Sequence, residues 1–124
     1  MSETIPQWAH ARLDVCDVTG RLEAVEAIRA LRLAVVTENP LGPRNHHLVQ
    51  FAQLVVLGHR AQAVDAAAAA RRAGATPSEL VGVVETALLS AGMPAYDLGM
   101  AVLADLLSVR DALLNTHPSF KEHE

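Results

Sequence analysis

The sequence predicts an all-α protein, and three observations lead to this prediction. Apolar residues recur at helical spacing over most of the chain, alternation typical of strands is absent over any useful length, and Gly and Pro divide the chain into segments of helical length. With 124 residues, 51% of them hydrophobic, the chain is expected to form one domain over residues 1–124. Aromatic residues make up only 3%, so the core should consist of Leu, Val and Ala.

The N-terminal part is expected to contain an arm followed by a helix. Residues 1–16 have weak periodicity and should form an N-terminal arm or one short helix. The run RLEAVEAIRALRLAVV over residues 21–36 has apolar residues at helical spacing, and either Asp17 or Thr19 is a suitable N-cap. The breaks Asn39-Pro40 and Gly42-Pro43 follow this helix.

The remaining boundaries come from Gly, Pro and one capping sequence. Gly58 should end a helix over residues 44–57, and Gly74 is a natural residue to end the next, over residues 59–73. The segment 76–79, Thr-Pro-Ser-Glu, has the pattern of a capping box and should start a helix that runs to about residue 90. After Gly92-Met93-Pro94 a last helix is expected over about residues 95–114, and its core stripe should contain Leu98, Val102, Leu106, Val109 and Leu113.

Charge and cysteine content exclude several classes of protein. The formal net charge is -4 and no basic cluster is larger than Arg71-Arg72, which argues against nucleic-acid binding. We expect no membrane span and no secretory signal, hence a cytoplasmic protein. Cys16 is the one cysteine, so no disulfide can form within the chain. The surplus of Ala and Val on so small a body favours a homo-oligomer.

Polar residues that could perform chemistry are concentrated between Arg44 and Gln62. His47 and His59 lie on either side of the Gly58 bend, and we expect the two helices to bring them together. Histidine titrates near neutral pH, as a general acid or base requires. Gln62 could hydrogen-bond a substrate carbonyl, and Arg44 could bind a carboxylate or an enolate. The alanines that follow on the same helix, Ala66 among them, would leave space for a ligand. A metal site is not expected, because no acidic ligand accompanies these histidines.

From Leu41 to about residue 107 the sequence resembles the carboxymuconolactone decarboxylase/alkylhydroperoxidase D superfamily. The strongest elements are AGATPSEL over residues 73–80 and AGMPA over residues 91–95. The resemblance implies a compact all-α domain of about five to six helices that assembles as trimers or hexamers. It also implies active sites near the contacts between subunits.

The catalytic residues of that superfamily are not kept in this sequence. In its peroxidase branch an acidic residue, a Cys-x-x-Cys pair and a His act together, and their positions are occupied here by His47, by His59 and Gln62, and by Ala66. Dithiol peroxidase activity is therefore not expected, because no thiolate is present at these positions. The decarboxylase branch uses a His at the position of Ala66, so its namesake reaction is not implied either.

Two functional hypotheses follow, and the sequence does not decide between them. The first is a small-molecule enzyme, lyase- or isomerase-like, that uses neither metal nor organic cofactor. It would decarboxylate, isomerise or cyclise a small carbonyl-bearing or lactone-type substrate, with His47 and His59 as acid and base, and with Gln62, Arg44 and the space at Ala66 binding the substrate. The second is a non-catalytic oligomeric binding or scaffold protein of the same fold. A peroxidase that uses Cys16 is a third, weaker reading.

Overall fold

The computed structural model describes residues 7–108, with side chains from residue 10 onward, and every regular element in this range is an α-helix. The all-α prediction is therefore confirmed for the described residues. The helices are α1 (Gln7–Val18), α2 (Leu22–Thr37), α3 (Gly42–Leu57), α4 (Arg60–Arg72), α5 (Pro77–Ala91) and α6 (Met93–Leu106). They divide between two units, Met1–Pro40 with α1 and α2, and Leu41–Glu124 with α3 to α6.

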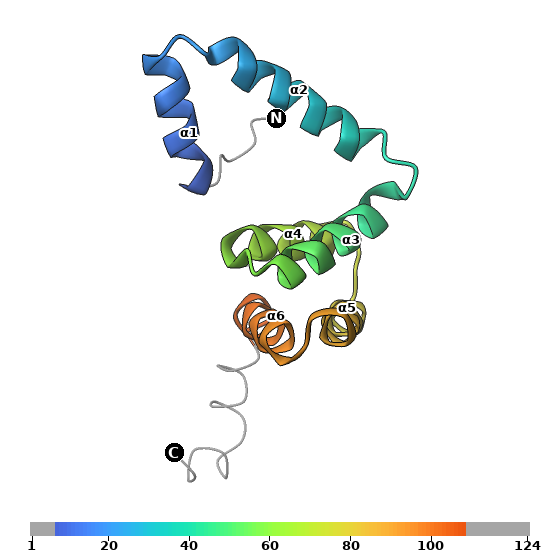
Figure 1. Ribbon diagram of the computed structural model, residues 1–124. Coiled ribbons are helices and arrows are strands. Elements are labelled where there is room, and N and C mark those ends of the chain that lie inside the picture. Colours follow the sequence, from blue (N-terminus) through green and yellow to red (C-terminus); the bar gives the residue numbers. More distant parts are fainter. Residues whose placement is uncertain (1–6, 109–124) are drawn as a thin grey trace. The chain divides into compact units, whose positions relative to one another are not determined.

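The Leu41–Glu124 unit consists of two layers, each formed by two helices (Figure 1). The pair α3 and α4 packs on the pair α5 and α6, with α3 in contact with α5 and α6, and α4 in contact with α6. Its core is aliphatic apart from Phe51, as the composition predicts. The buried side chains are Phe51 and Val55 of α3, Ala63, Ala66, Ala67 and Ala70 of α4, Ala75, Leu80, Val84 and Ala87 on and before α5, and Ala95, Val102 and Leu103 of α6.

Gly58 ends α3 and allows the chain to reverse into α4. It has φ 78° and ψ 22°, in the left-handed region that favours glycine. The amide of His59 donates to the carbonyl of Leu54, and the amide of Gly58 donates to that of Val55. This is the hydrogen-bond pattern of a Schellman motif. Since only Gly58 and His59 separate the two helices, α3 and α4 form a tight antiparallel hairpin.

The predicted capping box at the start of α5 is present. Thr76 is the N-cap, and its hydroxyl accepts a hydrogen bond from the amide of Glu79 at 3.1 Å. The carboxylate of Glu79 accepts in return from the amide of Thr76 at 2.9 Å. Two amides that α5 cannot satisfy internally are thus paired, and the start of α5 is fixed by local sequence alone.

Several predicted boundaries differ from the structure. The helix predicted to start at residue 44, α3, begins at Gly42. Neither Asp17 nor Thr19 caps α2, which begins at Leu22 with Arg21 as N-cap and no side-chain capping bond. Asp17 lies within α1, and the hydroxyl of Thr19 donates at 2.8 Å to the carbonyl of Val15 at the end of α1. The last helix, α6, runs from Met93 to Leu106, so it begins before the predicted residue 95 and ends before the predicted residue 114. Val109 and Leu113 of its predicted stripe lie outside the described residues.

None of the six described helices is both long and apolar enough to cross a membrane.

Candidate functional site

The polar residues singled out in the sequence lie at opposite ends of the α3–α4 hairpin. His47 is in the second turn of α3, whereas His59 follows the end of α3 and is the N-cap of α4. Ten residues of helix separate His47 from Leu57, which corresponds to about 15 Å at a rise of about 1.5 Å per residue. Two imidazole side chains cannot span this separation. The expectation that the chain brings His47 and His59 together is therefore wrong.

His47 lies in a partly buried, positively charged environment. Its pKa is lowered from the usual 6.5, chiefly because burial disfavours the charged ring, and further by the charges of His46 and Arg72. The side chain of Gln50, one turn along α3, acts in the opposite direction and raises the pKa. The rings of His46 and His47 meet edge to face, with centroids 5.0 Å apart. Among the described residues, Nδ1 of His47 is buried without a hydrogen-bond partner.

We expect this histidine to make the folded protein less stable as the pH falls. Because the pKa of His47 is lower in the folded chain than in the unfolded chain, unfolding takes up a proton at pH values just below 6.5. The contribution of His47 to the free energy of unfolding should therefore be complete above pH 6.5. It should decrease as the pH falls from 6.5 through the folded pKa. Urea unfolding of the wild type and of His47→Gln between pH 5 and 8 measures this, and the variant should show the weaker pH dependence. Equal slopes for the wild type and His47→Gln would contradict the assignment.

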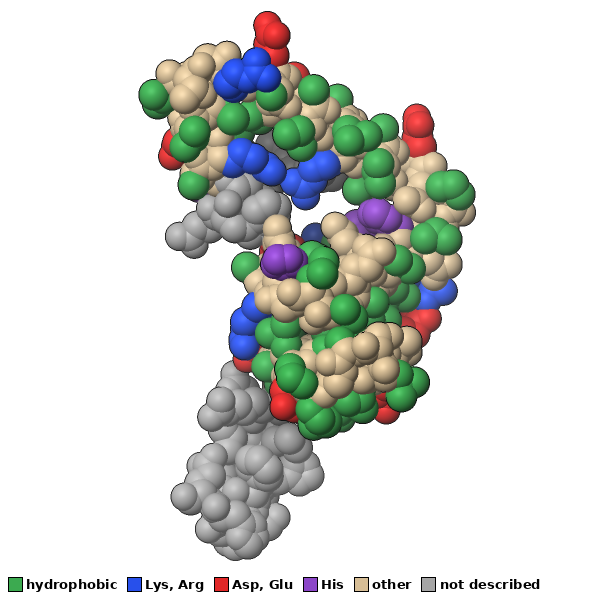
Figure 2. Space-filling model, viewed as in Figure 1, with side chains coloured by type: hydrophobic (Ala, Val, Ile, Leu, Met, Phe, Trp, Pro, Cys, Tyr) green, Lys and Arg blue, Asp and Glu red, His purple; other side chains and the backbone are tan. Residues whose placement is uncertain are grey.

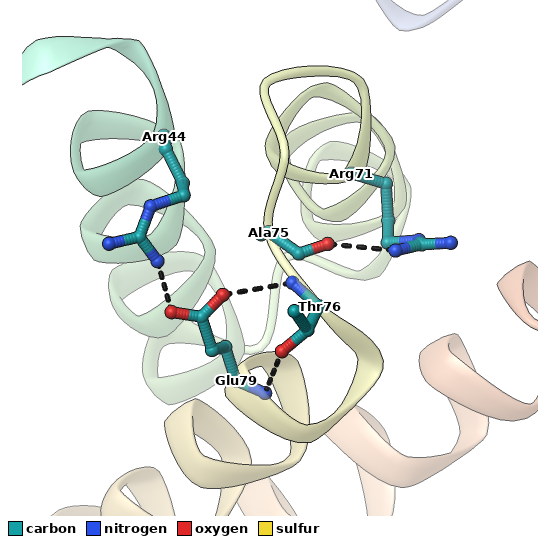
Figure 3. Close-up of polar contacts among 5 residues, drawn as sticks. All are labelled: Arg44, Arg71, Ala75, Thr76 and Glu79. Atoms are coloured by element: carbon teal, nitrogen blue, oxygen red, sulfur yellow. Dashed lines mark hydrogen bonds and ion pairs between the residues drawn. The ribbon is translucent and has the colours of Figure 1, made fainter.

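Arg44 holds α3 against α5 through the residues of the capping box (Figure 3). Its guanidinium forms an ion pair with Glu79, whose other carboxylate oxygen accepts from the amide of Thr76. The hydrogen bond from Thr76 and that from Arg44 both lower the pKa of Glu79. Nearby, the guanidinium of Arg71 donates at 2.8 Å to the carbonyl of Ala75. Arg44 is thus engaged by the fold through Nη1, and its role in substrate binding stays a prediction.

At the other end of the hairpin the side chains are more exposed. His59 is exposed and forms no side-chain capping bond to the start of α4, and Gln62 is half-buried in the first turn of α4. Arg60 approaches Asp105 of α6 at 3.5 Å in an exposed ion pair. Such a pair contributes little to stability.

Ala66 lies in the core of the unit. Its side chain is 4% exposed, and it belongs to the same hydrophobic cluster as Phe51, Ala63 and Ala70. The alanine side of α4, which the sequence suggested as the wall of a ligand pocket, thus faces the packed core between the helices. A role of Ala66 in substrate binding stays a prediction.

Sequence reasoning overlooked Arg72 as a neighbour of His47. The positions of His47 and Arg72 in the sequence could have indicated that the two residues are neighbours. Because α3 and α4 are antiparallel, His47, ten residues before the end of α3, lies toward the end of the hairpin where α4 finishes at Arg72. The charge of Arg72 does reach His47 and lowers the pKa of its ring. Gln50 also acts on the ring of His47. The group that the structure assembles is therefore His46, His47, Gln50 and Arg72.

Within the described part of the chain, no three His, Cys, Asp or Glu side chains gather closely enough to hold a metal ion.

Comparison with known proteins identifies a family. Residues 23–105, more than half of the chain, match the model of the carboxymuconolactone decarboxylase family. The match begins in α2 and ends in α6, so it includes helices from both units. Neither the curated proteins nor the solved structures contain a match to this chain.

Proposed function

Since the chain belongs to the carboxymuconolactone decarboxylase family, we propose that it is a small-molecule enzyme in which His47 is the acid/base group. The reaction would be decarboxylation, isomerisation or cyclisation of a small carbonyl-bearing or lactone-type substrate, of the lyase or isomerase kind. The observation that supports this best is the lowered pKa of His47, together with a buried Nδ1 that has no partner among the described residues. A lowered pKa favours the neutral imidazole, which is the form that can accept a proton from a carbon acid.

The neighbours of His47 suit the charge changes of such a reaction. Removal of a proton next to a carbonyl, or loss of carbon dioxide, leaves an enolate, which a cation stabilises. Arg72 is exposed at the end of α4 and has no carboxylate partner among the described residues. We assign to Arg72 the role of holding the substrate's anionic oxygen, which the sequence suggested for Arg44. Gln50 would orient the imidazole.

The decisive test is proton exchange, because it can be observed whatever the final product is. Purified protein would be incubated in D₂O with a panel of small lactones and keto acids, and NMR would follow deuterium uptake next to the carbonyl and loss of carbon dioxide. Loss of a general base typically costs about 10²–10⁴-fold in rate, so His47→Gln should lose the activity by that factor. His59→Gln is the matched control and should stay within a few-fold of the wild type. A larger loss in His59→Gln than in His47→Gln would contradict the proposal.

The second candidate function is a non-catalytic binding or scaffold protein of the same fold. It is supported by the engagement of Arg44 in an ion pair and by the position of Ala66 in the packed core. Absence of exchange with every compound in the panel would favour this candidate. The third hypothesis is a peroxidase that uses Cys16. Peroxide consumption by Cys16→Ser and by the wild type tests it, and equal rates would rule it out.

A further inference from the structure

His46 and His47 are consecutive histidines on α3, and their side chains lie together. The ring centroids are 5.0 Å apart, and the rings meet edge to face. Two positive charges at such a distance repel each other, and the repulsion is stronger at a protein surface than in bulk water because the effective dielectric constant is lower. A proton on one ring therefore opposes a proton on the other, so the two histidines do not titrate independently.

Positive charge from α4 acts on His47 in the same direction as that of His46. The charge of Arg72, at the end of α4, reaches the ring of His47, and an arginine keeps its charge at every pH at which a histidine titrates. On α5, Glu79 forms an ion pair with Arg44. The remaining charged residues on the helices packed against α3 are Arg60, Asp65 and Arg71 on α4, Glu85 on α5, and Asp97 and Asp105 on α6. A histidine is visible over the start of α3 in Figure 2, and no Asp or Glu side chain of the described residues lies beside it on this face. Positive charge thus reaches His47 both from its own helix and from α4.

We propose that His46 is a positioning residue that acts through His47: the charge that it gains as the pH falls keeps the ring of His47 neutral and able to accept a proton. This role rests on the proposed function of His47 as a general base, since only the neutral imidazole can take a proton from a substrate. The lowered pKa of His47, to which burial contributes most and the charge of His46 adds, agrees in direction. His46 needs no contact with the substrate for this. It determines how far toward acid pH the base remains active.

Titration of the histidine rings by NMR, on the full chain, tests this role without any substrate. In His46→Gln the ring of His47 should take up its proton at higher pH than in the wild type, because the repelling charge is gone. The transition should also become steeper, since interacting groups titrate over a wider pH range than a single group does. His46→Arg should move the transition to lower pH, because arginine stays charged. His47→Gln identifies the signal of that ring, and His59→Gln, altered at the far end of α3, should leave the His47 transition in place.

The pH profile of deuterium exchange connects the charge of His46 to the proposed reaction. The rate should rise with pH and become constant once His47 is neutral. In this constant range His46→Gln should stay within a few-fold of the wild type, because an uncharged His46 exerts no repulsion. On the acid side its rate should fall at least about three-fold below that of the wild type, and His46→Arg should restore the rate there. A merely structural role of His46 would instead lower the rate by the same factor at every pH.

The two measurements separate the role of His46 from the function of His47. If the His47 transition moves in opposite directions in His46→Gln and His46→Arg while no protein exchanges deuterium, the charge effect of His46 stands and the general-base function fails. If the wild type exchanges deuterium but the His47 transition lies at the same pH in all three proteins, the role of His46 is overturned and the function stands. A uniform loss of rate in both His46 variants would overturn the role of His46 as well.

Discussion

Phe51→Ala is expected to lower the free energy of unfolding by about 3–5 kcal/mol, the cost of truncating a fully buried phenylalanine. Phe51 is 0% exposed and is the largest of the fully buried side chains described. The α4 residues of its cluster, Ala63, Ala66, Ala67 and Ala70, are all small. Alanine side chains have no rotamers with which to fill a void, so the cavity should persist rather than collapse. Urea unfolding at one fixed protein concentration measures the loss.

Val49→Ala is the matched control for this prediction. Val49 lies on the same helix, α3, but is exposed. Its truncation should change the free energy of unfolding by no more than about 0.5 kcal/mol. If Phe51→Ala cost no more than Val49→Ala, the α3–α4 interface would not be the centre of the core.

The helix boundaries could be predicted because their causes are local. The capping box of Thr76 and Glu79 and the helix ends at Gly58 and Gly74 depend on a few adjacent residues, and the structure places each where the spacing predicts. The start of α2 could not be predicted in this way. Thr19 has the right chemistry for an N-cap, but its hydroxyl is used at the end of the preceding helix. Whether the Thr19 hydroxyl bonds at the end of α1 or caps the start of α2 depends on where α1 ends. The periodicity of residues 1–16 is too weak to predict that end.

The candidate site could be predicted only in part, because it depends on how helices align. The sequence identified His47 from its residue type, and the structure adds the burial that lowers its pKa. The sequence also suggested His59 as the partner of His47, on the assumption that the bend at Gly58 brings neighbouring polar residues together. A two-residue turn instead reverses the chain fully, so His59 stays at the turn while His47 is aligned with Arg72, at the far end of α4. The same geometry places Ala66 in the core, where periodicity alone cannot distinguish a pocket wall from a packed interface.

Gly99→Ala is expected to destabilise the protein by about 1–2 kcal/mol, although alanine is the better helix former. Gly99 lies within α6, where replacing Gly by Ala normally gains about 1 kcal/mol. Here a Cβ would lie 2.7 Å from Cγ2, 2.8 Å from Cγ1 and 3.2 Å from Cβ of Val84 on α5. Rotation of Val84 cannot relieve this, because both branches and the Cβ itself are too close. Overpacking of about 1–3 kcal/mol should therefore exceed the helical gain.

Gly82→Ala should have the opposite sign, which separates the steric effect from helix propensity. Gly82 lies within α5, and a Cβ built on it would meet nothing within 4 Å. This variant should gain about 0.5–1 kcal/mol. Combining Gly99→Ala with Val84→Ala provides the second check: removing the two methyl groups that clash should make the double variant more stable than the sum of the single losses implies. Thermal and urea unfolding at equal concentration measure the four variants and the wild type. Additive losses in the double variant would mean that α5 and α6 are not in close contact at Gly99, and that the small residue is there for another reason.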